Sequence, residues 1–150
     1  MSSLYRGMDR AALDDAYNNV KAVVDFPTVL SRFRTRSAIF YGNPKCCRGL
    51  AYGKGDRQRY DLVLGGGQDA PTVVYVHGGY WQTLSKEDFA FVGEGPLAHG
   101  FNIVLAEYTL APAATMTEIV DEIGRLLDHL AENRERLGIG QGRVALVGHS

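Results

Sequence analysis

The chain has 150 residues, of which 45% are hydrophobic and 22% are charged. This is the composition of one folded domain with an apolar core, and it excludes a disordered, collagen-like or low-complexity chain. Sixteen Lys and Arg against 17 Asp and Glu give a net charge of -1, so there is no excess positive charge for nucleic acid or an anionic membrane surface.

No targeting or membrane-spanning segment is expected in this sequence. Its first ten residues lack the apolar stretch of a signal peptide, and no run approaches the roughly 18 apolar residues of a membrane span. The only two cysteines, Cys46 and Cys47, are neighbours, and a disulfide between neighbours is strained. We therefore expect free thiols and a cytoplasmic protein whose partners include neither nucleic acid nor a membrane.

Two helices are predicted in the first 45 residues. Apolar residues recur in steps of three and four from Leu13 to Val24, which indicates one helix. Asp9 can cap its start, and Pro27 is expected to end it. A second, shorter helix is predicted over residues 28–40. We leave open whether this helical segment closes over the site as a lid or packs against the edge of the sheet.

A hairpin is predicted next, because the pattern changes from a helical period to alternation. Residues 57–64 place Tyr60, Leu62 and Leu64 on one side of a strand. Residues 50–52 can pair with this strand after a turn that contains two glycines. The pair is expected to be antiparallel and to lie at an edge of the sheet.

Three continuous apolar runs follow, of the kind that a strand buried on both faces requires. They are residues 72–76, 102–106 and 143–147. Amphipathic helices are predicted between them, one from about residue 86 and a long one over residues 116–137. Strands that alternate with helices in this way indicate βαβ crossovers and a parallel sheet.

Both of these helices begin with the spacing of a capping box. The two pairs are Ser85 with Asp88 and Thr115 with Glu118. The long helix is expected to bury one apolar stripe, formed by Ile119, Ile123, Leu126, Leu127 and Leu130.

Two unusual segments follow the first and the third apolar run. The sequence His-Gly-Gly-Tyr-Trp occupies residues 77–81, and Gly-His-Ser occupies residues 148–150. Ligands gather at the carboxyl ends of the strands in open parallel sheets. We therefore expect both segments to lie at one binding edge.

Each segment has a catalytic interpretation and a structural alternative. A strand followed by Gly-x-Ser is the front half of a nucleophile elbow, which would make Ser150 a nucleophile. The alternative is a serine that only caps the next helix. The two glycines of the other segment suit an oxyanion hole, because residues without Cβ let backbone N–H groups converge on a developing negative charge. Here the alternative is a glycine-rich turn by which the chain leaves the strand.

At these motifs the chain resembles the α/β-hydrolase fold, within it the branch of kynurenine formamidases (arylformamidases) and hormone-sensitive-lipase-like esterases. Residues 77–81 match the His-Gly-Gly-x-Trp signature of kynurenine formamidases. Residues 107–112 resemble the Asp-Tyr-Arg-Leu-Ala-Pro segment of this branch, and residues 16–19 are similar to the first helix of bacterial arylformamidase-like hydrolases. The resemblance implies a three-layer α/β sandwich with a mostly parallel sheet, an antiparallel edge hairpin and amino-terminal helices.

The resemblance also implies roles for individual residues. Ser150 is the nucleophile, and the amides of Gly78, Gly79 and Tyr80 form the oxyanion hole. We also assign Tyr80, Trp81 and His149 to the substrate pocket. For Trp81 a core position is an equal alternative, and for His149 packing beside the elbow is the favoured alternative. No metal and no organic cofactor is expected, because serine, base and oxyanion hole supply the chemistry.

Further polar residues are expected to support loops rather than to react. We expect His77 to brace its turn by hydrogen bonds, and Glu107 and Tyr108 to anchor the loop in which they lie. His99 and His129 are expected to face solvent or to cap helices.

Residues 1–150 are expected to be the amino-terminal part of a single α/β-hydrolase domain. Within this part, residues 1–45 are a helical segment and candidate lid, and residues 46–150 are the sheet core up to the nucleophile elbow. The order Ser, Asp, His in this fold places the acid and the base of the triad beyond Ser150.

These inferences predict a serine hydrolase that cleaves a small N-acyl amide or ester through an acyl-enzyme. N-formylkynurenine is the sharpest candidate substrate, which implies tryptophan catabolism. A broad-specificity carboxylesterase is the alternative among enzymes, and a noncatalytic relative that binds a small hydrophobic ligand is the alternative from another class. The expected partner is a small acyl substrate, and a homodimer is left open.

Overall fold

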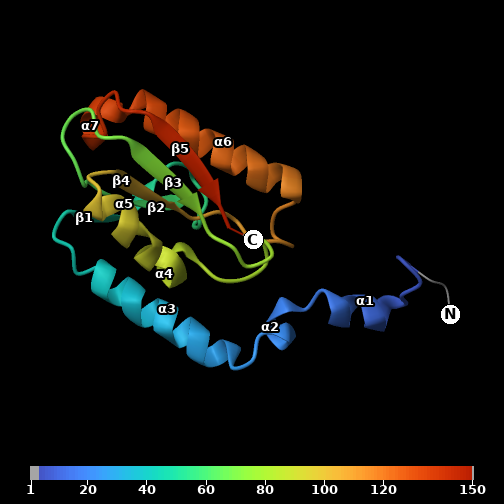
Figure 1. Cartoon of the computed structure of the whole chain (residues 1–150). Coiled ribbons are helices and arrows are strands. Elements are labelled where there is room, and N and C mark those ends of the chain that lie inside the picture. Colours follow the sequence, from blue (N-terminus) through green and yellow to red (C-terminus); the bar gives the residue numbers. More distant parts are fainter. Residues whose placement is uncertain (1–3, 150) are drawn as a thin grey trace. The chain divides into compact units, whose positions relative to one another are not determined.

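The computed structural model describes residues 4–149, which divide into one unit that ends at Arg32 and a second that begins at Phe33. The second unit is built on a five-stranded sheet (Figure 1). Its strands are β1 (Cys46–Ala51), β2 (Arg59–Val63), β3 (Thr72–Val76), β4 (Asn102–Ala106) and β5 (Val144–Gly148).

The strands lie in the order β1-β2-β4-β3-β5. β1 and β2 form the predicted antiparallel hairpin at one edge, with Leu50 opposite Tyr60. β2 is also antiparallel to β4, whereas β3 is parallel to both of its neighbours, β4 and β5. The carboxyl ends of β3 and β5 therefore meet at one end of the sheet, where Val76 lies opposite Gly148.

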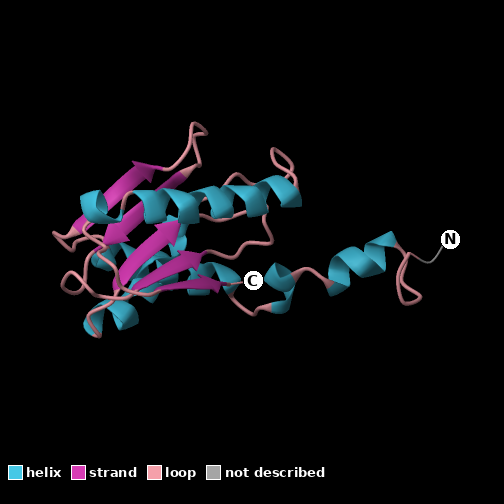
Figure 2. Ribbon diagram, turned by 90° about the horizontal axis from the view of Figure 1, so that it is seen from above, coloured by secondary structure: helices cyan, strands magenta, loops and turns pink. Residues whose placement is uncertain are grey.

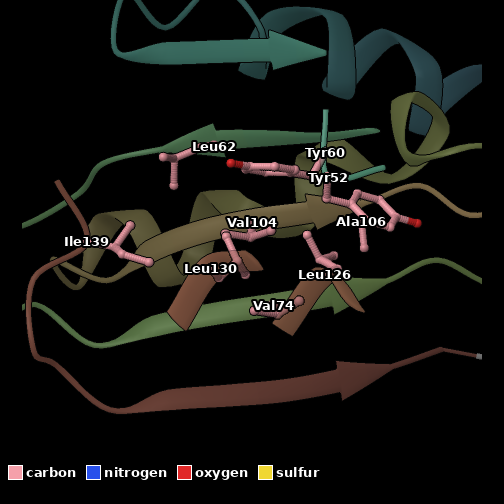
Figure 3. Packing of buried hydrophobic residues seen from close by; sticks show 9 residues of the cluster. All are labelled: Tyr52, Tyr60, Leu62, Val74, Val104, Ala106, Leu126, Leu130 and Ile139. Carbon is pink, nitrogen blue, oxygen red and sulfur yellow. The ribbon is translucent and has the colours of Figure 1, made fainter. Parts of the chain in front are cut away.

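One hydrophobic core lies between the sheet and α6 (Met116–Glu132). Val74 and Val104, on neighbouring strands, pack there with Leu126 and Leu130 of the helix (Figure 3). Successive residues of a strand face opposite sides of the sheet. The residues that precede and follow each of these valines in its strand therefore belong to a different core.

That second core lies on the opposite face, under α4 (Lys86–Phe89), α5 (Glu94–Ala98) and the end of α3 (Phe26–Phe40). Phe89 and Ile103 are buried in it. β4 is buried along its whole length, whereas β5 is exposed along its whole length. Helices on both faces of the sheet give the three layers that were predicted (Figures 1 and 2).

Both predicted capping boxes are present at the starts of α4 and α6. The helix predicted over residues 116–137 is divided at Asn133 into α6 and α7 (Arg134–Leu137). The side-chain amide of Asn133 donates to the carbonyl of His129 at 2.8 Å, a local bond that competes with continuation of the helix. No helix within residues 4–149 combines the length and the apolar character of a membrane span.

The amino-terminal unit does not contain the single helix predicted up to Pro27. It has α1 (Arg10–Ala16), capped by Asp9 as predicted, and a separate α2 (Asn19–Ala22). The side-chain oxygen of Asn18 accepts from the backbone N–H three residues later at 3.1 Å, so Asn18 caps a new helix instead of continuing α1. Pro27 lies in the first turn of α3, where its missing N–H is not needed, and thus it begins a helix rather than ending one.

Candidate active site

The chain leaves β3 through residues 77–84, a segment that we call the β3 turn. A Cβ added to Gly78 would lie 2.6 Å from Nδ1 of His149, and one added to Gly79 would lie 2.1 Å from the carbonyl oxygen of Thr83. Gly79 also has a φ of 129°, a conformation that residues with a side chain rarely adopt. The tight packing of the β3 turn therefore depends on both glycines.

Tyr80 and Trp81 continue the β3 turn in the left-handed region, with φ values of 56° and 58°. Within the part of the chain that the structure describes, no acceptor meets the backbone N–H groups of Gly79, Tyr80 and Trp81. The two aromatic residues are 54% and 41% exposed, and their ring centroids are 5.6 Å apart. The β3 turn thus offers unpaired N–H donors beside two accessible rings.

β5 brings the second predicted segment to the β3 turn. The backbone N–H of His149 donates to the carbonyl of Val76 at 3.1 Å, which extends the pairing of the two strands by one residue. The ring centroid of His149 is 5.6 Å from that of Phe89. Ser150, the predicted nucleophile, is the next residue in the chain and lies outside the described residues.

His77 is completely buried at the start of the β3 turn. Its ring is stacked on that of Tyr108, with centroids 4.5 Å apart. Nδ1 lies 2.8 Å from the carbonyl oxygen of Gly78, and Nε2 lies 2.9 Å from Oε1 of Glu107. These contacts of the two ring nitrogens and the stacking on Tyr108 hold the β3 turn, which is the bracing role predicted for this histidine.

Glu107 directly follows β4, and its carboxylate accepts several hydrogen bonds from residues around the β3 turn. Besides His77, its Oε1 accepts from Nη2 of Arg57 at 2.6 Å and from the N–H of Tyr108 at 3.1 Å. Its Oε2 accepts from the N–H of Lys86 at 3.2 Å. The side chain is only 7% exposed, so these donors replace water around the carboxylate. Glu107 therefore anchors its loop, as the sequence predicted.

Arg57 joins this cluster from the turn between β1 and β2. Its Nε donates to the carbonyl of Tyr108 at 2.9 Å, and its Nη2 donates to the carbonyl of Leu84 at 2.9 Å. No sequence pattern pointed to Arg57, because its partner Glu107 lies 50 positions away in the chain. Only the pairing of β2 with β4 brings the two residues together.

Burial changes the acidity of two tyrosines in the cluster. It raises the pKa of Tyr108 to about 12, and the carboxylate of Glu107 contributes further. Burial also raises the pKa of Tyr52, followed in effect by the charges of Glu122 and Glu107. Tyr108 donates to the carbonyl of His77 at 2.9 Å, and Tyr52 to that of Glu107 at 2.8 Å. Both phenols therefore remain protonated donors at neutral pH.

Two further histidines have partners outside the β3 turn. His99 is exposed, as expected, and its Nδ1 lies 2.9 Å from the carbonyl oxygen of Gly95. His129 is half-buried, and its Nε2 lies 3.2 Å from the hydroxyl of Tyr60, so it packs on the sheet instead of facing solvent or capping a helix. This burial lowers the pKa of His129. Among residues 4–149, no group of three or more His, Cys, Asp or Glu side chains is placed to hold a metal ion.

Sequence comparisons connect the chain with known enzymes. The BD-FAE family matches residues 62–150. The kynurenine formamidase of Salmo salar is 39% identical over 113 residues, which cover 69% of this chain and 37% of that protein. The kynurenine formamidase of Danio rerio is 34% identical over 103 residues, which cover 67% of this chain and 34% of that protein. The chain thus spans about a third of the length of these relatives.

Solved structures share the fold. A protein from Silicibacter sp., provisionally named a thioesterase, is 29% identical with a TM-score of 0.80, over 91% of this chain and 51% of its own. A hyperthermophilic esterase from the archaeon Pyrobaculum calidifontis is 26% identical with a TM-score of 0.66, over 85% of this chain and 44% of its own. These likenesses confirm the predicted three-layer fold with its open, mixed sheet.

Proposed function

The chain belongs to the BD-FAE family and has the α/β-hydrolase fold, and from this premise we propose that it is the amino-terminal part of a serine hydrolase. The proposed reaction is the cleavage of a small N-acyl amide or ester, with N-formylkynurenine as the favoured substrate. The kynurenine formamidases of the two fishes support this choice. We place the reaction in the cytoplasm, since Cys46 and Cys47 are free thiols.

One hydrogen bond carries this proposal. The N–H of His149 donates to the carbonyl of Val76 at 3.1 Å, at the point where β3 leads into its turn. This bond holds the end of β5 beside the start of the β3 turn, in which the N–H groups of Gly79 and Tyr80 have no acceptor among the described residues. A nucleophile and oxyanion donors at neighbouring strand ends are the arrangement that acyl transfer requires.

In the proposed mechanism the hydroxyl oxygen of Ser150 attacks the formyl or acyl carbonyl, and its proton passes to a base supplied by the remainder of the enzyme. The carbonyl oxygen becomes an oxyanion that accepts from the N–H groups of the β3 turn. Collapse of this intermediate breaks the bond to the leaving amine or alcohol, which takes up the proton. Water then hydrolyses the acyl-enzyme and regenerates the serine. The rings of Tyr80, Trp81 and His149 are proposed to contact the aryl leaving group.

A broad carboxylesterase is the second candidate function, and the similarity to the Pyrobaculum esterase favours it. The two candidates differ in the size of the acyl pocket. A pocket for a formyl group excludes longer acyl chains by steric overlap, whereas an esterase pocket gains from the extra apolar surface.

The complete enzyme should therefore be assayed with formyl, acetyl and butyryl substrates that share one aryl leaving group, together with N-formylkynurenine. We expect kcat/KM to be highest for the formyl compounds. Trp81→Ala should reduce this preference while hydrolysis of a small activated acetate ester changes less, because that ester makes little contact with the ring. A preference for butyryl with N-formylkynurenine untouched would replace the formamidase by the broad esterase.

Ser150→Ala is the control for the nucleophile in the same assay. It should fold normally and lose roughly 10⁴–10⁶-fold in kcat, as expected when a covalent nucleophile is removed. A serine-directed phosphonate should label Ser150 in the unsubstituted enzyme. Turnover that survives in Ser150→Ala would show that Ser150 is not the nucleophile. Either another residue then performs the reaction, or the protein is a noncatalytic binding protein and the turnover comes from a contaminating enzyme.

A further inference from the structure

The two ends of the β3 turn are fastened to one ion pair outside it. At the first end, Nε2 of His77 lies 2.9 Å from Oε1 of Glu107. At the last end, the carbonyl of Leu84 accepts from Nη2 of Arg57 at 2.9 Å. Arg57 and Glu107 are themselves 2.6 Å apart through the same two atoms, Nη2 and Oε1. A single guanidinium–carboxylate pair therefore spans the turn.

Between these ends the backbone adopts conformations that side chains disfavour. Tyr80, Trp81 and Leu84 all have positive φ values, between 56° and 68°. Three hydrogen bonds within the turn run to the carbonyl of Gly79, from the N–H groups of Gln82 and Thr83 and from the hydroxyl of Thr83. Such strain persists only where the surroundings impose it. Here the surroundings are the two fastened ends and the N–H of Ala111, which donates to the carbonyl of Trp81 at 2.8 Å.

We propose that Arg57 is a positioning residue for the β3 turn: its guanidinium, paired with Glu107, holds the turn in the conformation that leaves the N–H groups of Gly79 and Tyr80 free for an oxyanion. The inference rests on the proposed function and adds to it a residue of a distant hairpin that does not touch the substrate.

The planar shape of the guanidinium is essential to this role. Its Nε and Nη2 point in different directions and donate at the same time to Tyr108, Leu84 and Glu107. A lysine ammonium keeps the charge but does not reproduce this fork. If Arg57 merely neutralised Glu107, lysine would replace it without loss.

The test compares Arg57→Gln and Arg57→Lys with Arg59→Gln and Arg59→Lys in the complete enzyme. Arg59 is the matched control, since among residues 4–149 the only hydrogen bonds of its guanidinium run from Nη1 to the carbonyls of Gly53 and Gln58, each at 3.4 Å, within its own hairpin. The measurements are kcat and KM for an aryl formate and an aryl acetate, the affinity for an aryl trifluoromethyl ketone, and amide hydrogen exchange of residues 77–84. The ketone is chosen because its adduct with the serine carries an oxyanion.

We expect Arg57→Gln to lower kcat by roughly 10²-fold, the lower end of the effect of losing one oxyanion donor, with KM changed less than about threefold. Affinity for the ketone should fall by the same factor, amide exchange in the turn should accelerate, and Arg57→Lys should recover only a small part of the loss. Both Arg59 variants should match the unsubstituted enzyme. The proposal would be overturned if Arg57→Gln raised KM without lowering kcat, if Arg57→Lys had the full activity of the unsubstituted enzyme, or if amide exchange of residues 77–84 were unchanged in Arg57→Gln.

Failure of the proposed function gives a different result. If the unsubstituted enzyme hydrolyses none of the acyl substrates, the proposed function is wrong, and amide exchange still decides the role of Arg57. Faster exchange of the β3 turn in Arg57→Gln than in Arg59→Gln then supports the positioning role, and equal exchange refutes it.

Discussion

Gly79 is the residue of the β3 turn whose conformation is most restricted. Its φ of 129° and the 2.1 Å that would separate an added Cβ from the carbonyl oxygen of Thr83 exclude any side chain without movement of the backbone. We expect Gly79→Ala to lower kcat/KM by roughly 10²-fold or more, because the displaced N–H groups no longer meet the oxyanion. It should also destabilise the fold by about 1–3 kcal/mol through backbone strain.

Gly67→Ala is the matched control for this substitution. Gly67 has no atom within 4 Å of an added Cβ, and its φ is not positive. The measurements are kcat/KM with an aryl acetate and the urea midpoint of unfolding for both variants. The interpretation is wrong if Gly79→Ala and Gly67→Ala have the same kcat/KM.

At this scale the sequence predicts what is local and misses what is not. His77 and the two glycines after it were recognisable because they directly follow an apolar run in the sequence. The anchoring role of Glu107 was predicted, but its partners on other elements were not. Arg57 was not, because its importance comes from a carboxylate and two carbonyls that belong to other loops.

Among the elements, the edge hairpin is joined to α4 by a buried ion pair. Asp61 of β2 is fully buried and accepts from the N–H of Gly49 at 2.6 Å, the hydroxyl of Tyr41 at 2.7 Å and Nζ of Lys86 at 2.9 Å. Since Lys86 also donates its backbone N–H to Glu107, α4 is held at its first residue from two sides. The hairpin that carries Arg57 and the helix that follows the β3 turn thus share one anchor.

Lys86→Met should destabilise the complete protein by about 3–5 kcal/mol, because it leaves the carboxylate of Asp61 buried without its counter-charge. The control is Lys21→Met, whose partner Asp15 is as exposed as the lysine itself, and it should change stability by less than about 1 kcal/mol. Both effects are measured as shifts of the urea midpoint of unfolding between variants that have the same m-value. Adding Asp61→Asn to Lys86→Met should recover part of the loss, and a loss no larger than that of Lys21→Met would contradict the argument.

Helix starts were predictable because a capping box is a local hydrogen-bond pattern, and the two that were expected at α4 and α6 are present. Helix interiors were harder. Glu122 interrupts the expected apolar stripe of α6 as a buried carboxylate that accepts from Nε2 of Gln58 at 2.9 Å and from the N–H of Thr109 at 2.8 Å. A buried glutamate is stabilised by partners on other elements, so its own helix gives no sign of its environment.

For the whole molecule, the order of the strands determines where the site can lie. From β3 the chain crosses to β4 on one side, and then back over β3 to β5 on its other side. The end of β3 is therefore the point at which the connections diverge, where open α/β sheets form their binding crevice. The sequence predicted parallel strands with both motifs at one end, but the order of the strands depends on contacts between distant segments and required the structure.

The same order leaves β5 at the edge of the sheet. Among the described residues it pairs with β3 alone, and Val144, Leu146 and Val147 are 38%, 52% and 43% exposed. Val144 and Leu146 also border a hollow of about 270 Å³ beside Leu127 and Leu130 of α6. An apolar edge strand with a free row of N–H and C=O groups is a template for pairing with another chain.

We therefore expect the 150-residue chain, produced alone, to self-associate and to show no acyl-transfer turnover. Light scattering over a concentration series should detect the association. Leu146→Lys should shift the chain toward monomer, because a charge on an edge strand opposes pairing with a second strand. Val120→Lys adds the same charge at a 64% exposed position of α6 and should not. Equal effects of the two lysines would place the contact elsewhere than β5, and a stable monomer with a cooperative melt and esterase turnover would refute the prediction as a whole.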